Sequence, residues 1–155
     1  DRAVGRERAL DVSRTVRLEG ASRFAEQRLP DPLTLLLVED EPLVALALQH
    51  LLEDAGYRVL LASSGAEGAV ALDRHSHEIA GLITDIRLGA GPDGWSLAAQ
   101  ARALRPMLPV LYVSGDSAHQ WAFRGVGGSV MLAKPFSAPS ILEALADMLG
   151  SGCRA

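Results

Sequence analysis

The stretch LTLLLVEDE, residues 33–41, decides the fold class of this chain. A continuous apolar run from Leu33 to Val38 is ended at once by three acids. A short apolar run of this kind is typical of a strand that is buried on both faces of a parallel sheet. Pro42 suits a first helical turn and Gly56 suits a helix stop, so a helix is predicted between them.

The same order of strand and helix repeats along the chain, and Ser64 is expected to cap the second helix. Five strands alternating with five helices over residues 33–150 predict an α/β fold, a doubly wound parallel sheet with helices on both faces. The expected strands are 33–38, 57–62, 79–84, 109–114 and 129–133, and the expected helices are 41–56, 64–75, 95–105, 117–125 and 137–150.

Residues 1–32 differ from the rest of the chain. They carry seven arginines and six acids without a sustained apolar stripe, and Pro30 and Pro32 mark their end. We therefore predict an N-terminal extension or linker over 1–32, with a short helix near residues 22–29. A single domain is predicted over 33–150, and a C-terminal tail over 151–155.

Composition and charge exclude several classes of function. The net charge of -4 argues against a general nucleic-acid-binding surface, and no apolar run approaches the length of a membrane span. We expect no direct nucleic-acid contact, no membrane insertion and a cytoplasmic location. The single cysteine, Cys153, has no partner for an internal disulfide or at metal-ligand spacing. No DNA-binding segment follows Gly150, so direct transcriptional output is not expected.

Residues able to do chemistry stand where the predicted strands end. Ligands of such sheets bind beyond the carboxyl ends of the strands, so these residues should share one crevice. Clustered carboxylates favour a hard divalent cation, Mg²⁺ by default, and a lysine with a hydroxyl suits an anionic phosphoryl group. Glu41 is expected only to cap the next helix. The residues are Glu39, Asp40 and Glu41 after the first strand, Asp85 after the third, Ser114 after the fourth and Lys134 after the fifth.

Each of these residues alone has a plainer interpretation. An acid after a strand often caps a helix or forms a turn, a serine often belongs to a turn, and a lysine before proline is often exposed. Lys134 is nevertheless the only lysine among fifteen cationic side chains. A compact ammonium on a flexible stem is something that a forked guanidinium does not imitate. Taken together, the four strand ends favour a phosphoryl site.

Four segments resemble the receiver domain of bacterial two-component response regulators: LLLVEDEPLVALALQHLLEDAGYRV, LITDIRL, PVLYVSGD and LAKPF. They occur in order at the expected strand ends, and the resemblance covers residues 33–150. It implies a flavodoxin-like sheet with the strand order 2-1-3-4-5. The chain would then be a stand-alone, chemotaxis-regulator-like receiver or the C-terminal receiver of a hybrid histidine kinase.

The resemblance also implies a role for each site residue. Asp85 corresponds to the phospho-acceptor, and Ser114 and Lys134 correspond to contacts of the phosphoryl group. The implied Mg²⁺ ligands are Asp40, Asp85, the backbone carbonyl of Arg87 and, mainly through water, Glu39. The bond before Pro135 is expected to be cis.

The implied reaction is Mg²⁺-dependent transfer of a phosphoryl group from a phosphohistidine to Asp85. The donor would be a sensor histidine kinase or a phosphotransfer protein. The chain would be a regulatory phosphoacceptor, not an enzyme, with self-catalysed transfer and slow autodephosphorylation only. Phosphorylation would shift its conformation, with Ser114 following the new charge. The resemblance also allows a homodimer.

Two positions depart from the family pattern. Receivers commonly carry Tyr or Phe as a switch three residues before the lysine, where this chain has Met131. Output would then use the loop after the fourth strand with Tyr112 or Trp121, although both aromatics also fit simple packing. The side chain of Arg87 has three open interpretations: it shields the phosphoryl group, pairs with Glu39 or faces solvent.

The sequence leaves two rival functions open. A pseudo-receiver would keep the fold as an interaction module without using phosphorylation, and Met131 favours it. A Mg²⁺-dependent phosphatase with an aspartyl nucleophile would carry a paired DxD after the first strand, which VEDEP lacks.

Overall fold

The computed structural model describes residues 31–153, and its centre is one sheet of five parallel strands. The strands lie in the order β2-β1-β3-β4-β5, which confirms the predicted flavodoxin-like order. The helix predicted near residues 22–29 lies outside the described residues. The strands are β1 (Thr34–Val38), β2 (Arg58–Ala62), β3 (Ile79–Asp85), β4 (Val110–Ser114) and β5 (Val130–Ala133).

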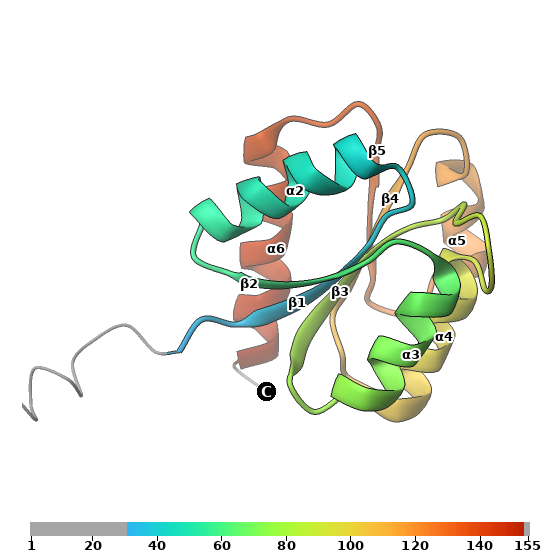
Figure 1. Ribbon diagram of the computed structural model, residues 1–155, viewed down its shortest axis with the longest axis horizontal. Coiled ribbons are helices and arrows are strands. Elements are labelled where there is room, and N and C mark those ends of the chain that lie inside the picture. Colours follow the sequence, from blue (N-terminus) through green and yellow to red (C-terminus); the bar gives the residue numbers. More distant parts are fainter. Residues whose placement is uncertain (1–30, 154–155) are drawn as a thin grey trace, which may run out of the picture. The chain divides into compact units, whose positions relative to one another are not determined.

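Helices cover both faces of this sheet, as the alternating pattern predicts. In Figure 1, α2 and α6 lie on one face, and α3, α4 and α5 lie on the other. The order of the elements along the chain makes every connection between neighbouring strands a crossover through a helix. The helices are α2 (Pro42–Asp54), α3 (Gly65–His75), α4 (Gly94–Leu104), α5 (Trp121–Arg124) and α6 (Ala138–Cys153).

The first strand shows why a continuous apolar run was needed here. Leu35 and Leu37 belong to the core under α2 and α6, whereas Leu36 and Val38 belong to the core under α3 and α4. All four side chains are fully buried. Since successive side chains in a strand point to opposite faces, a strand between two helical layers must be apolar at every position. Each such leucine contributes roughly 1.5–3 kcal/mol through burial.

Helix α2 begins as expected at Pro42, but Glu41 does not cap it as predicted. Glu41 occupies the N-cap position without any side-chain capping hydrogen bond. Pro42 has no N–H to satisfy, so the first turn needs less capping than usual. The helix ends at Asp54, and Gly56 follows it with a φ of 99°, in the left-handed region that glycine adopts without a steric penalty.

Helix α3 is capped as predicted. The hydroxyl of Ser64 accepts a hydrogen bond from the Glu67 backbone N–H at 3.1 Å. The carboxylate of Glu67 in turn accepts one from the Ser63 N–H at 2.5 Å. The first bond satisfies one of the N–H groups that a helix start leaves free, and the second satisfies the N–H of the residue just before the cap.

The weak helix predicted over 117–125 is shorter and broken. It consists of a 3-10 turn, Ala118–Gln120, followed by α5, which has only four residues. Gly125 then leaves helical geometry and enters the glycine-rich link to β5. A helix this short has few buried side chains, and none of the four α5 residues is buried.

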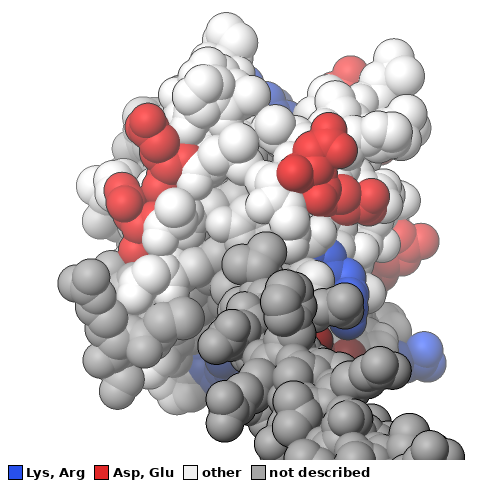
Figure 2. Space-filling model, turned by 90° about the vertical axis from the view of Figure 1, so that its left-hand side faces the viewer, with Lys and Arg blue, Asp and Glu red and all other residues white. Residues whose placement is uncertain are grey.

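Acidic side chains gather in separate clusters on the surface. Figure 2 shows several clusters of acidic side chains on one face, with only scattered basic ones among the described residues. No helix in residues 31–153 combines the length and apolar character needed to cross a membrane.

Candidate functional site

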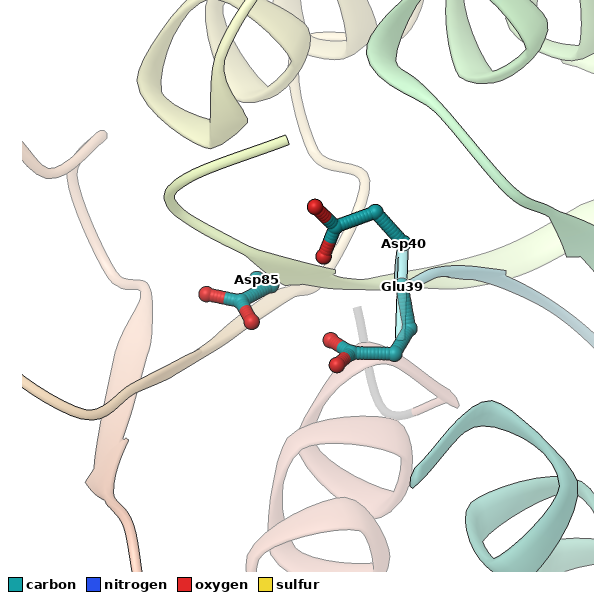
Figure 3. A group of neighbouring side chains, drawn as sticks. All are labelled: Glu39, Asp40 and Asp85. Atoms are coloured by element: carbon teal, nitrogen blue, oxygen red, sulfur yellow. The ribbon is translucent and has the colours of Figure 1, made fainter. Parts of the chain in front are cut away.

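The carboxyl ends of β1 and β3 bring three carboxylates together. Val38 of β1 lies beside Thr84 of β3, so the residues that follow them, Glu39 and Asp85, become neighbours. Oxygen atoms of Glu39, Asp40 and Asp85 all lie within 4.8 Å of one another. In Figure 3 the three carboxylates project to the same side of the strand ends. The predicted cluster of acids is therefore present in the structure.

Lys134 reaches this cluster from the end of β5. Its Nζ lies 2.8 Å from Oδ2 of Asp85 and 3.4 Å from Oε1 of Glu39. Its backbone N–H donates to the Ser114 carbonyl at 2.7 Å, which fixes the start of the side chain beside β4. The Lys134–Pro135 peptide bond is cis, as predicted. The one lysine of the chain thus lies between two carboxylates, and its side chain is only 25% exposed.

The electrostatics of the cluster are dominated by the burial of Glu39. Burial, and after it Asp85, raise the pKa of Glu39 above its usual 4.5, Lys134 opposes both, and the resulting pKa is about 7. Burial also lowers the pKa of Lys134, but Asp85 and Glu39 together outweigh this, and the net shift is upward. Three carboxyl groups thus face one ammonium, and a bound cation would favour the ionised form of Glu39.

The donor set fits Mg²⁺. Oε2 of Glu39 is buried and has no hydrogen-bond partner among the described residues, which leaves an acceptor oxygen to be satisfied. Asp40 is exposed and Asp85 is half-buried, so the cluster opens to solvent on one side. Carboxylate oxygens with an open side suit an ion that keeps several of its waters.

Ser114 ends β4 and is buried, with 1% of its surface exposed. Its Oγ accepts a hydrogen bond from the Ser117 backbone N–H at 2.8 Å. The hydroxyl proton is not used in this bond, so Ser114 can still donate to an incoming anion.

Sequence reasoning missed Gly94, the first residue of α4, which holds the backbone of Asp85. A Cβ built on Gly94 would lie 2.2 Å from the Asp85 carbonyl oxygen, and the Gly94 N–H donates to the Ile86 carbonyl at 2.8 Å. Only glycine lets α4 begin this close to the strand end. The signal that could have found it is Asp93, whose side chain caps α4 by accepting from the Ser96 N–H.

The remaining predicted residues lie around this cluster. The side chain of Arg87 does not pair with Glu39; it is 79% exposed, and its Nη2 lies 2.9 Å from Oδ2 of Asp116. Met131 is half-buried and packs against the core under α3 and α4. Tyr112 is fully buried in that core, and Trp121 is 38% exposed. The carbonyl of Arg87 as a metal ligand stays a prediction.

Comparison with known proteins identifies one matching family and similar solved structures. The sequence model of the family described as response regulator receiver domain matches residues 35–146. A response regulator receiver protein from Sinorhizobium medicae is 38% identical, with a TM-score of 0.75, over 77% of this chain and 96% of that chain. The receiver domain of a sensor histidine kinase from Pseudomonas aeruginosa, solved with magnesium coordinated in its active site cleft, is 25% identical. Its TM-score is 0.67, over 77% of this chain and 98% of that chain.

A longer curated relative is the transcriptional regulatory protein GlrR of Escherichia coli. It is 32% identical over 120 residues, which are 76% of this chain but 26% of that protein. The chain therefore spans about a quarter of the length of the first curated relatives it matches.

Proposed function

The chain belongs to the response regulator receiver domain family, and we propose that it takes up a phosphoryl group on Asp85. The observation that carries this proposal is the contact of 2.8 Å between Lys134 Nζ and Asp85 Oδ2, inside a cluster of three carboxylates. An ammonium in this position pairs with the Asp85 carboxylate and is close enough to contact an oxygen added to it.

The reaction would be an in-line displacement on phosphorus. A carboxylate oxygen of Asp85 attacks the phosphorus of a phosphohistidine on the partner, the P–N bond breaks, and the imidazole leaves with the electron pair. The product is an aspartyl phosphate. Lys134 would neutralise the transferred oxygens, and the free hydroxyl proton of Ser114 would donate to one of them.

Glu39, Asp40 and Asp85 would hold Mg²⁺, with the carbonyl of Arg87 as a further ligand. When bound, the ion supplies positive charge next to the oxygens of the phosphoryl group. Oε2 of Glu39, which has no hydrogen-bond partner within residues 31–153, supports this assignment. Glu39 must lose its proton for the site to carry its full charge.

The same proposal includes the domain boundaries of the chain and its phosphoryl donor. Residues 33–150 would be the receiver domain, with an extension over 1–32 and a tail over 151–155. The donor would be a sensor histidine kinase or a phosphotransfer protein. The domain would be regulatory, with phosphoryl transfer and slow autodephosphorylation as its only chemistry.

The rival function is a pseudo-receiver, an interaction module that does not use phosphorylation. Met131, at the position where receivers commonly carry an aromatic switch, favours it. The contacts of Lys134 with Asp85 and Glu39 favour the phospho-receiver, because an unused site has no reason to keep a buried carboxylate with a pKa near 7.

The test is the intact mass of the protein after incubation with acetyl phosphate and Mg²⁺. The wild type should gain about 80 Da, the mass of one phosphoryl group, and EDTA should abolish the gain. Asp85→Asn should gain nothing. Asp54→Asn, the same change at an exposed position at the end of α2, should gain mass like the wild type.

Two results would contradict the proposal. A gain that persists in Asp85→Asn would place the phosphoryl group on another residue. A folded wild type that gains no mass at any time would support the pseudo-receiver instead.

A further inference from the structure

Tyr112 of β4 links the strand that carries Ser114 to a distant loop. Its side chain is fully buried, and its hydroxyl oxygen accepts a hydrogen bond from the Val126 backbone N–H at 3.1 Å. Tyr112 and Ser114 are two residues apart on one strand, so their side chains lie on the same face of the sheet. A shift of the strand end at Ser114 therefore has a short, rigid path to Val126.

Val126 belongs to the α5–β5 loop, residues 125–129, which is rich in glycine. It contains Gly125, Gly127 and Gly128, and Gly128 has a φ of 72°. Glycines lose more conformational freedom on ordering than other residues, so such a loop depends on its anchors.

The anchors of the α5–β5 loop come from three elements. Arg102 of α4 donates to the Gly127 carbonyl at 2.6 Å. The indole N–H of Trp121 in α5 donates to the Ser129 hydroxyl at 2.9 Å. The third anchor is the Tyr112 hydroxyl, and it is the one attached to the strand that ends in the site. In the described part of the chain, no other β4 side chain hydrogen-bonds to this loop.

The aromatic packing around Tyr112 extends the link to α5. The rings of Tyr112 and Trp95 lie 4.8 Å apart at 54°, and the guanidinium of Arg124 in α5 lies 5.5 Å above Trp95. The indole N–H of Trp95 is buried without a hydrogen-bond partner among the described residues. No hydrogen bond among the described residues therefore fixes this ring, and it can follow a displacement of Tyr112.

Met131 cannot make the same link, although it lies directly beside Tyr112 in the neighbouring strand. Its thioether has no hydrogen to donate and is only a weak acceptor. Its side chain is half-buried, whereas Tyr112 is fully buried. The hydrogen bond between the sheet and the α5–β5 loop is thus made by Tyr112 of β4 and not by Met131 of β5.

We propose that Tyr112 is the positioning residue through which the phosphoryl site sets the conformation of the α5–β5 loop. The inference rests on the proposed function, since phosphorylation of Asp85 supplies the charge that draws Ser114. Movement of Ser114 shifts the end of β4, the bond between Tyr112 and Val126 opens, and the loop gains freedom.

The first arm of the test needs no phosphorylation. Tyr112→Phe keeps the ring and removes only the hydroxyl, and Tyr57→Phe makes the same change at the other tyrosine of the chain, on the opposite core. Loss of one hydrogen bond should speed amide hydrogen exchange at Val126 roughly fivefold in Tyr112→Phe and leave it unchanged in Tyr57→Phe. Equal exchange in all three proteins would overturn the link.

The second arm measures the response to acetyl phosphate and Mg²⁺, with the mass gain recorded on the same samples. Trp95 packs against Tyr112, and Trp121 hydrogen-bonds to Ser129 of the α5–β5 loop. These are the two tryptophans of the chain, so its tryptophan fluorescence reports on this region. The wild type should change its emission and lose protection at Val126 on phosphorylation. Tyr112→Phe should gain the same mass while losing most of both changes, and Met131→Leu should respond like the wild type.

The outcomes separate the inference from the proposed function. A Tyr112→Phe protein that gains mass and responds like the wild type would overturn the coupling alone, because a merely structural role would only lower its stability in urea. A Tyr112→Phe protein that is folded but gains no mass would place Tyr112 in the transfer step and likewise overturn it. A wild type that gains no mass would overturn the proposed function, and the coupling with it.

Discussion

Replacing Glu39 with glutamine tests the electrostatics of the strand ends. Glu39 is 1% exposed, and burial first and Asp85 second raise its pKa from 4.5 to about 7. Between these pH values the folded protein keeps a proton that the unfolded chain has lost. The free energy of unfolding must then fall as the pH rises through this range, and the contribution levels off above it.

The size of this effect follows from the pKa difference. A carboxyl whose pKa rises from 4.5 to about 7 on folding lowers the free energy of unfolding by roughly 3 kcal/mol once it is ionised. Glutamine has nearly the same shape and no charge, so Glu39→Gln should lack this fall. Mg²⁺ should oppose the fall in the wild type, because it binds the ionised folded form.

The assay is urea unfolding followed by circular dichroism, in EDTA, from about pH 5 to about pH 8. The difference in unfolding free energy between Glu39→Gln and the wild type should grow by about 2–4 kcal/mol across this range. Asp40→Asn removes the exposed carboxylate of the same cluster and should keep the wild-type slope. Parallel profiles for Glu39→Gln and the wild type would refute the reasoning.

Three further predictions concern the same site. Lys134→Arg should slow phosphorylation by acetyl phosphate at least tenfold, because a guanidinium cannot take the place of an ammonium that contacts both Asp85 and Glu39; equal rates of mass gain would count against it. Gly94→Ala should lower the free energy of unfolding by about 1–3 kcal/mol in urea, whereas Gly115→Ala, which meets open space, should change it little. Mg²⁺ at about a hundred times its Kd should raise the free energy of unfolding by roughly 2.7 kcal/mol at alkaline pH, and EDTA should reverse this in calorimetry.

The sheet was predictable because its signals are local. The apolar run of β1 must face two helical layers, and parallel strands must place their carboxyl ends at one edge. These two facts were enough to predict that Glu39, Asp85, Ser114 and Lys134 lie close together. The structure places them at the same edge of the sheet. The cap at Ser64 was likewise visible from its short-range pattern.

Burial within the acidic run was harder to predict. Glu39, Asp40 and Glu41 look alike in sequence, yet only Glu39 is buried. The Glu39 N–H still bonds to the Ala62 carbonyl of β2, so the strand conformation extends to it. Its side chain therefore continues the set formed by Leu35 and Leu37, and this follows from the strand register and not from composition.

Some contacts between loops were not predictable. The approach of Gly94 to the Asp85 carbonyl and the pairing of Arg87 with Asp116 both depend on how two loops pass each other. Glu41 failed as a cap because Pro42 removed part of the need for one. Such details depend on tertiary distances that no local pattern encodes.

The contact between Lys134 and Glu39 has a consequence for how the protein is made. It joins side chains 95 positions apart in the chain. A ribosome adding about 5 to 20 residues per second needs roughly 5 to 20 s to make the segment between them. During that time the nascent chain carries the acids without the ammonium that completes the site. A half-made chain therefore lacks the lysine that the proposed phosphoryl transfer needs, and only the finished sheet contains the complete site.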